Sequence, residues 1–192
     1  MIALDIETSG LNQCRCGIWQ IGAIDLPSGR EFFIEGRIDN EDAIEKEALI
    51  ITGKTEQELR DPSKPYQKSI IESLFSWLKD KSMRNFLCQN PCFDVSYISA
   101  KARKYALPIP YGHRSFDLHT IAQLIYYKNH GIYMASNGKS SFDLSKILDY
   151  CGFHDTRISL ENGKIKKPGT PHSALEDARL LVSCYKKLME LK

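Results

Sequence analysis

The 192-residue sequence lacks both a membrane-spanning run and a signal peptide. Its N-terminus has neither the positively charged start nor the long apolar run of a signal peptide. We therefore expect a soluble, intracellular protein with a cytoplasmic location and no membrane partner. Neither sign of charge dominates, because 26 Lys and Arg oppose 24 Asp and Glu. The net charge of +2 is too small to identify a nucleic-acid-binding protein, and it does not exclude one.

The six cysteines do not have the spacing of a disulfide framework. Cys14 and Cys16 are close together, but no second Cys or His pair accompanies them, and a structural zinc site needs four ligands. We therefore expect reduced thiols. Internal repeats and an interdomain linker are also missing from the sequence. The chain is too short for two sizeable cores, so we expect a single domain over residues 1–192.

The spacing of apolar residues indicates which segments are strands and which are helices. Period-two patterns and short apolar runs predict strands at 2–7, 18–26, 31–38 and 85–88. Helical spacing predicts helices around 70–78, 91–105, 118–125, 144–151 and 174–191. This order favours a layered α/β domain with a mixed sheet. Residues 129–141 and 156–171 are long irregular stretches, which in compact domains are usually functional or mobile.

Two carboxylates stand two residues apart in the first predicted strand. Because side chains alternate along a strand, Asp5 and Glu7 share one face, and Ile2, Leu4 and Ile6 point to the core on the other face. Two like charges in an interior strand are costly unless a cation neutralises them, and hard divalent cations prefer oxygen ligands. The alternative is an edge strand with two solvated acids. Taken alone, Asp-x-Glu is weak evidence for function.

A third acid falls within the apolar face of a predicted helix. Asn90 is suited to cap this helix and Pro91 to its first position. Asp94 lies within the arc that includes Phe93 and Tyr97, where a carboxylate without a partner is unfavourable. The alternative is an Asp stabilised by the dipole near the helix N-terminus, and capping alone explains Asn90.

The last predicted helix carries a fourth acid and follows a histidine. On a helical wheel Asp177 lies about 20° outside the apolar stripe, which places it at the rim of the core. Ser173 is a suitable N-cap. His172 cannot share the face of Asp177 and belongs to the preceding loop or first turn, from which its side chain can swing toward a site. A structural role is the alternative for a lone histidine.

Together these segments resemble the DEDDh family of 3′→5′ exonucleases, within the RNase H-like superfamily. DIETSGL matches the family's first motif, QNPCFD the second, and PHSALEDA the third, His-x-Ala-x-x-Asp-Ala. A sister family has Tyr where His172 stands, so the histidine version is indicated. Weaker similarities extend the resemblance over nearly the whole chain. It implies an α/β, RNase H-like exonuclease fold, in which helices flank a central mixed five-stranded sheet.

The resemblance also implies a mechanism. Two Mg²⁺ or Mn²⁺ ions would be held by four acids, namely Asp5, Glu7, Asp94 and Asp177, with Asp5 bridging the ions. Such a pair, about 4 Å apart, clamps the scissile phosphate and activates a water. His172 would be the general base, because its ordinary pKa of about 6.5 lets it accept a proton at neutral pH. The partner would be DNA or RNA with a free 3′ end, and the products nucleoside 5′-monophosphates.

Five further residues match family positions that contact the terminal nucleotide, namely Thr8, Gly10, Leu11, Asn90 and Phe93. Leu11 could act as a wedge against the last base. The alternatives are turn formation for Thr8 and Gly10, and a place in the core for Leu11.

A non-catalytic nucleic-acid-binding or polymerase-associated module of the same fold is the rival interpretation. Loss of one acid would be its mark, and all four acids are present. The chain stops at Lys192 without the tether expected of a proofreading subunit, which favours a free-standing exonuclease. The sequence does not distinguish DNA from RNA, or single strands from frayed duplex ends. Relatives include dimers, so the sequence leaves open whether this chain forms a homodimer.

The chain departs from many relatives by an insertion before His172, with the sequence HDTRISLENGKIKKPGTP. Asn162-Gly163 is a strong signal for a two-residue hairpin turn. Three lysines, at positions 164, 166 and 167, add positive charge beside the predicted site. We hypothesise that this hairpin is a basic flap that contacts substrate phosphates, and the alternative is a merely solvated hairpin.

Replacing Lys164, Lys166 and Lys167 with alanine tests the basic flap. Each phosphate contact releases counterions, so the triple variant should bind a single-stranded oligonucleotide more weakly. The slope of its binding constant against salt concentration should become shallower by up to about 2 on logarithmic axes. Fluorescence anisotropy titrations at several salt concentrations measure both quantities, and an unchanged slope would argue against the flap.

Overall fold

A five-stranded sheet in the order β3-β2-β1-β4-β5 forms the centre of the computed structural model, which describes residues 1–191. β1 (Ile2–Thr8), β2 (Ile18–Asp25) and β3 (Glu31–Glu35) are antiparallel neighbours. β4 (Phe86–Cys88) and β5 (Phe116–Asp117) extend the sheet parallel to β1. The mixed five-stranded sheet that the sequence predicts is therefore confirmed.

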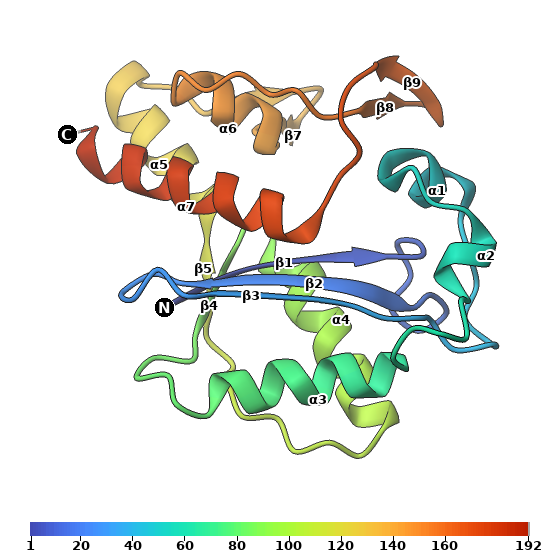
Figure 1. Ribbon diagram of the computed structural model, residues 1–192. Coiled ribbons are helices and arrows are strands. Elements are labelled where there is room, and N and C mark those ends of the chain that lie inside the picture. The colour runs from blue at the N-terminus through green and yellow to red at the C-terminus, as the bar shows by residue number, and fades with distance from the viewer. Residues whose placement is uncertain (192) are drawn as a thin grey trace.

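Helices cover both faces of this sheet (Figure 1). One face carries α3 (Gln67–Leu78) and α4 (Pro91–Lys104). The other carries α5 (Leu118–His130), α6 (Leu144–Tyr150) and α7 (Ala174–Glu190). Two short helices, α1 (Lys46–Thr52) and α2 (Glu56–Leu59), follow β3 in the chain. None of the helices within residues 1–191 is long and apolar enough to span a bilayer.

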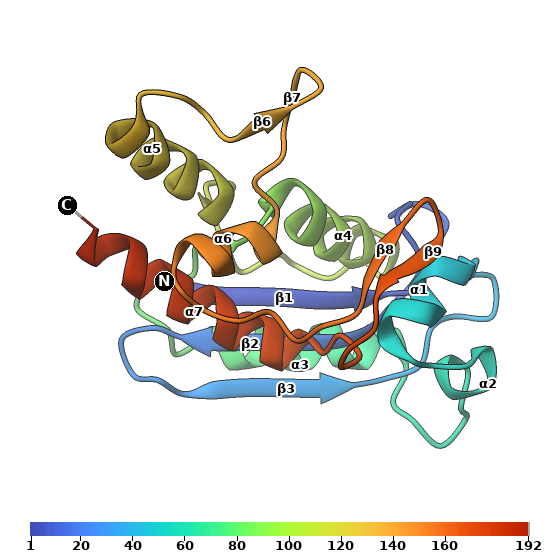
Figure 2. The ribbon, with the colours of Figure 1, turned by 90° about the horizontal axis from the view of Figure 1, so that it is seen from above.

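Two small hairpins stand outside the central sheet (Figure 2). One joins β6 (Ala135–Ser136) to β7 (Lys139–Ser140), and the other joins β8 (Ser159–Glu161) to β9 (Lys164–Lys167). The Asn162-Gly163 turn is confirmed, because both residues have positive φ, 52° and 72°, as such a turn requires. The stretches predicted to be irregular, 129–141 and 156–171, thus each contain a hairpin.

β1 is buried on both faces, and its side chains contribute to two separate cores. Ile2, Leu4 and Ile6 pack in the core beneath α3 and α4, whereas Ala3 packs in the core beneath α7. Alternation along the strand therefore places Asp5 and Glu7 on the face that α7 covers. The opposite faces predicted for the acids and the apolar residues agree with this arrangement.

The first turn of α7 rests directly on β2 at Gly22, which pairs in register with Asp5. A Cβ atom at Gly22 would collide with the backbone of Ala174 and Leu175, so only glycine permits this approach. The backbone N–H of Ala174 donates to Oε1 of Gln20 at 2.6 Å. This contact replaces the capping bond expected from the side chain at position 173, which makes none. The start of α7 is thereby fixed beside β1.

Some predicted features differ from the structure. Asn90 occupies the N-cap position of α4, as predicted, but its side chain makes no capping hydrogen bond. β3 ends at Glu35 rather than at residue 38. The spacing of apolar residues does not predict α2, although Thr55 and Glu58 form a capping box, a pattern visible in the sequence. It does not predict β5 either, because two residues are too few to show a period.

Candidate active site

The four predicted acids come from three elements that meet at one end of the sheet. Asp5 and Glu7 lie on β1, Asp94 on the first turn of α4, and Asp177 on the first turn of α7. Asp94 is 6% exposed and Asp177 is 4% exposed. Asp177 is therefore buried rather than at the rim, because β1 and the insertion cover it as well as its own helix.

Burial raises the pKa values of three of these acids, and for two of them the charges of neighbouring acids contribute. Burial, and then the charges of Asp177 and Asp94, raise the pKa of Asp5 well above its ordinary value. Burial and the charge of Asp177 raise the pKa of Glu7 to about 8. Burial raises the pKa of Asp94 to about 7, although backbone N–H groups lower it in part. Burial and like charge therefore oppose the joint ionisation of Asp5, Glu7 and Asp94 unless positive charge is added.

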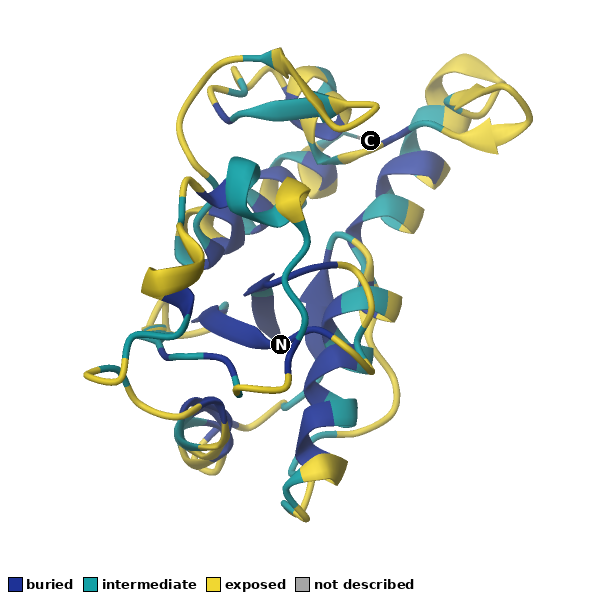
Figure 3. Ribbon diagram, turned by 90° about the vertical axis from the view of Figure 1, so that its right-hand side faces the viewer, coloured by how far each residue is buried: buried dark blue, intermediate teal, exposed yellow. Residues whose placement is uncertain are grey.

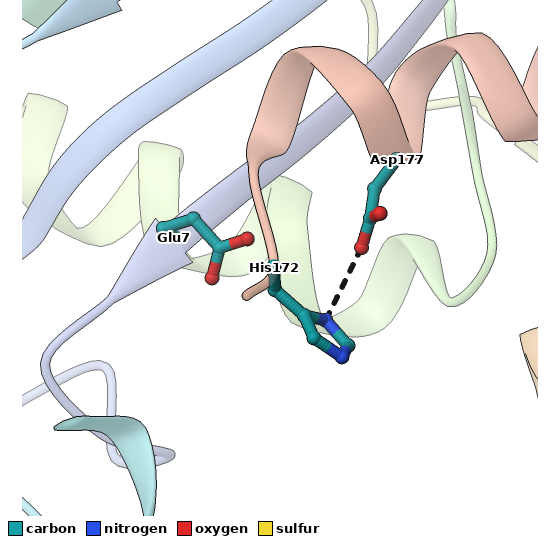
Figure 4. Close-up of side chains that lie close together, drawn as sticks. All are labelled: Glu7, His172 and Asp177. Atoms are coloured by element: carbon teal, nitrogen blue, oxygen red, sulfur yellow. Dashed lines mark ion pairs between the residues drawn. The ribbon is translucent and has the colours of Figure 1, made fainter. Parts of the chain in front are cut away.

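His172 lies just before α7 and points toward Asp177, as Figure 4 shows. Its Nδ1 is 3.3 Å from Oδ2 of Asp177, and its Nε2 is 2.9 Å from the carbonyl oxygen of Ile158. A carbonyl only accepts, so Nε2 carries a hydrogen. Burial lowers the pKa of His172, but the hydrogen bond and charge of Asp177 outweigh it and raise that pKa overall. The protonated ring satisfies both contacts.

The structure adds Arg157, which the sequence analysis did not single out. Its Nη1 donates to Oδ2 of Asp177 at 2.8 Å, and its Nε donates to Oδ1 of Asp155 at 2.9 Å. Asp155 also accepts a hydrogen bond from the hydroxyl of Ser145 on α6. The insertion therefore places a buried guanidinium against an acid of the site. The only signal in the sequence was the Asp-x-Arg spacing within the insertion.

The side chains present fit a divalent cation. Glu7, His172 and Asp177 each offer a ligand atom, and these atoms lie within 4.8 Å of one another. Oδ1 of Asp177 is buried and has no hydrogen-bond partner among the described residues. A buried carboxylate oxygen without a partner is costly unless a bound ion or water satisfies it. Oxygen-rich sites of this kind suit Mg²⁺ or Mn²⁺.

A cavity of about 480 Å³ adjoins the acids, and Glu7 is one of its lining residues. Leu11 and Phe93 also line it, as do Leu160 and Asn162 of the β8–β9 hairpin. A larger cavity of about 630 Å³ lies between the loop after β1 and α4, but none of the four acids lines it. The smaller cavity is therefore the candidate substrate pocket.

The predicted contact residues differ in how they meet this cavity. Leu11 is 78% exposed, so the alternative that it belongs to the core is wrong. Thr8 and Gly10 line the cavity and also shape the turn, because Oγ1 of Thr8 donates to the carbonyl of Gly10 at 2.7 Å. Asn90 is exposed and is not among the residues that line the cavity.

The three lysines of the β8–β9 hairpin differ in their surroundings. Nζ of Lys166 is 2.9 Å from Oε1 of Glu161 in an exposed ion pair. Nζ of Lys167 donates to the backbone carbonyl of Asp155. Lys164 is exposed. The basic flap stays a prediction, and it depends chiefly on Lys164 and Lys166.

Comparison with known families identifies the class of protein. The sequence model of the RNase T exonuclease family matches residues 2–185. The chain belongs to this exonuclease family, and the nuclease class predicted from the three motifs is confirmed. No curated protein matches the chain by sequence.

Solved structures share the fold of this chain. The nuclease domain of 3′hExo, a DEDDh family member bound to rAMP, has a TM-score of 0.68 at 11% identity, over 98% of this chain and 90% of that one. Cell-death related nuclease 4 has a TM-score of 0.69 at 14% identity, over 98% and 63%. Exonuclease I of E. coli in complex with a dT13 oligonucleotide has a TM-score of 0.69 at 19% identity, over 98% and 40%. This chain thus spans less than two thirds of the last two proteins.

The raised pKa of Glu7 predicts how the stability of the protein in EDTA depends on pH. The pKa of Glu7 is about 8 in the folded protein instead of 4.5, so between these pH values the carboxyl takes up a proton on folding. The stability of the folded protein therefore falls as pH rises from 4.5 to about 8. His172 acts in the same direction, because its raised pKa contributes stability only at lower pH. The free energy of unfolding should decrease by on the order of 3 kcal/mol across the window.

Urea denaturation at a series of pH values between these limits measures this dependence. The variant Glu7→Gln should show a shallower decrease, because its amide does not titrate. Mg²⁺ should stabilise the wild-type protein more at the alkaline end, where it does not compete with protons. A wild-type stability that is constant or rises with pH would contradict the interpretation.

Replacing Arg157 with methionine tests its role as the internal counter-charge. Removing one partner of a buried ion pair leaves the other uncompensated, so the free energy of unfolding in EDTA at neutral pH should fall by about 3 kcal/mol. Arg157→Lys should lose less, because it keeps the charge but not the planar fork. Equal stability of Arg157→Met and the wild-type protein in urea denaturation would show that the guanidinium has no such role.

Proposed function

We propose that this protein is a 3′→5′ exonuclease that releases nucleoside 5′-monophosphates from the 3′ end of a nucleic acid. The observation that carries the proposal is the convergence of four acids from three elements beside a cavity of about 480 Å³. That volume lies within the range of small-ligand pockets, about 300–1,000 Å³. A nucleotide at the end of a strand could therefore lie with its phosphate at the acids.

Asp5, Glu7, Asp94 and Asp177 would hold two Mg²⁺ or Mn²⁺ ions. When bound, such ions polarise the scissile phosphate, activate a water and stabilise the leaving oxygen. The unpartnered Oδ1 of Asp177 supports this assignment, because Oδ2 of the same carboxylate is already occupied by Arg157 and His172. Asp177 thus has one oxygen committed to the protein and one oxygen free for a cation.

His172 would accept the proton of the attacking water. Both ring nitrogens are engaged in the described geometry, so Nε2 must first leave the carbonyl of Ile158. Positive charge arriving beside Asp177 would weaken the attraction that keeps the imidazole protonated. The ring would then become neutral and able to act as a base. The contact between the ring and Ile158, just before β8, must therefore break before His172 acts as a base.

The terminal nucleotide would occupy the cavity between two walls. Leu11 and Phe93 form one wall, and Leu160 and Asn162 of the inserted hairpin contribute to the other. Leu11 would press against the last base, and its exposure at the cavity supports this role. The hairpin makes the pocket of this chain more enclosed than β1 and α4 alone would.

Structural neighbours support a nucleic-acid substrate of either sugar type. The E. coli enzyme was captured with a DNA oligonucleotide, and 3′hExo with rAMP. A 3′-exonuclease that recognises a histone mRNA stem-loop also shares the fold, with a TM-score of 0.68 at 11% identity over 98% of this chain. The rival, a non-catalytic binding module, would bind an oligonucleotide without shortening it.

Trimming of a 5′-labelled oligonucleotide tests the proposed function. Products resolved nucleotide by nucleotide on matched DNA and RNA substrates should shorten from the 3′ end, and EDTA should abolish shortening. Asp177→Asn should lose at least about a hundredfold in rate, because substituting even the indirect partners of metal ligands typically costs about 10- to 100-fold. Glu176→Gln, an exposed acid on the same turn, is the matched control and should keep full activity. Binding without shortening by the wild-type protein would favour the rival.

A further inference from the structure

A second organised surface lies on residues 118–142, which we call the tyrosine arm. It consists of α5 and the β6–β7 hairpin, and Gln123 holds the two together. Nε2 of Gln123 donates to the carbonyl of Met134 at 2.8 Å and to Oγ of Ser140 at 2.6 Å. Oε1 of Gln123 accepts from the backbone N–H of Met134 at 3.0 Å. Gln123 is buried, so these bonds fix the hairpin to the helix.

The tyrosine arm exposes large apolar side chains in spite of this order. Ile132 is 62% exposed, Leu124 58% and Tyr133 55%. The rings of Tyr127 and Tyr133 stack at 4.6 Å with an angle of 20° between their planes. Figure 3 shows both strands of the hairpin as exposed, and Figure 2 shows the arm projecting from the body of the molecule. Grouped exposed apolar side chains commonly mark a binding surface.

The charge of the tyrosine arm identifies the kind of partner. Asp and Glu make up 24 of 192 residues, or one in eight, so about three are expected in 25 residues. Residues 118–142 contain none, although Asp117 and Asp143 flank them and Asp117 accepts a hydrogen bond from Thr120. The segment contains Lys128, Lys139, His119 and His130, and the lysines attract phosphates. Exposed aromatic rings stack with nucleobases of any sequence. This combination fits single-stranded nucleic acid.

A cavity of about 330 Å³ lies between α5 and the hairpin. Its lining includes His119, Leu124, Tyr133 and Lys139. α5 follows β5 directly, and Asp117 of β5 pairs in register with Cys88 of β4. The carboxyl ends of the parallel strands β1, β4 and β5 lie at one end of the sheet, so the start of α5, which contributes His119 to the cavity, lies at the same end as the acids.

We propose that the tyrosine arm binds the single-stranded part of the substrate upstream of the scissile bond. Bases would stack on the exposed faces near Tyr133, and Lys139 would attract the backbone phosphates. This proposal rests on the exonuclease function proposed above, because the strand must run from the acids to the arm. It predicts that affinity increases with strand length beyond the terminal nucleotides.

The double variant Tyr133→Ala/Lys139→Ala tests this inference. Anisotropy titrations with Ca²⁺ in place of Mg²⁺, to prevent cleavage, would compare a 5′-labelled strand of about 12 nucleotides with a labelled dinucleotide. The dissociation constant of the longer strand should increase about tenfold, the effect of losing one stacked base. That of the dinucleotide should not change. Both substituted residues are exposed, so the variant should fold normally.

The matched control is Tyr66→Ala/Lys68→Ala, which removes the same residue types at the start of α3, on the other face of the sheet. It should bind both oligonucleotides as the wild-type protein does. Wild-type affinity of the Tyr133 variant for the longer strand would overturn the inference. So would a change in its solution mass by light scattering, which would assign the surface to a second copy of the chain. Failure of the wild-type protein to shorten any strand, with its length-dependent binding intact, would instead overturn only the exonuclease proposal.

Discussion

Mutual repulsion among buried carboxylates is the constraint on which this structure depends. Four acids lie close together where water is largely excluded, and the charges of Asp177 and Asp94 help to raise the pKa values of Asp5 and Glu7. The chain compensates with Arg157, which contacts Asp177 and reaches it from the insertion rather than from the central sheet. His172 supplies a second positive charge to the same carboxylate. The site is therefore held together by cations of its own and keeps one carboxylate oxygen unpaired.

This arrangement gives the insertion two functions in one segment. Its first part delivers Arg157 and the carbonyl of Ile158 to the acids, and its hairpin tip lines the candidate pocket through Leu160 and Asn162. The backbone N–H of His172 donates to the carbonyl of Ile51 on α1, at 3.0 Å. α1 contributes to the same pocket. Occupancy of the pocket and orientation of the histidine are thus linked by a short chain of contacts, which is a physical basis for coupling substrate binding to proton transfer.

The sequence predicts the parts of this site that local periodicity governs. Alternation along β1 is enough to place Asp5 and Glu7 on one face, and the helical wheel is enough to place Asp94 among apolar residues. The same wheel puts Asp177 at a rim, because a wheel contains no information on what packs against the helix from other elements. The role of Arg157 cannot be predicted from local patterns, because its partner Asp177 is twenty positions away and no period connects the two residues. The turn at Asn162-Gly163 is predictable because its backbone needs positive φ, whereas β5 is too short for any pattern.

Gly22 has a further consequence for how the site tolerates sequence change. α7 meets β2 there through main-chain atoms, so the separation between the helix and the strand pair depends on no side chain at that point. Substitutions that enlarge or shrink either core would tilt other helices before they altered this spacing. The distance between Asp5 and the helix that bears Asp177 should therefore change little when residues of the two cores are substituted. Relatives could diverge widely in their cores and still keep the same arrangement of carboxylates.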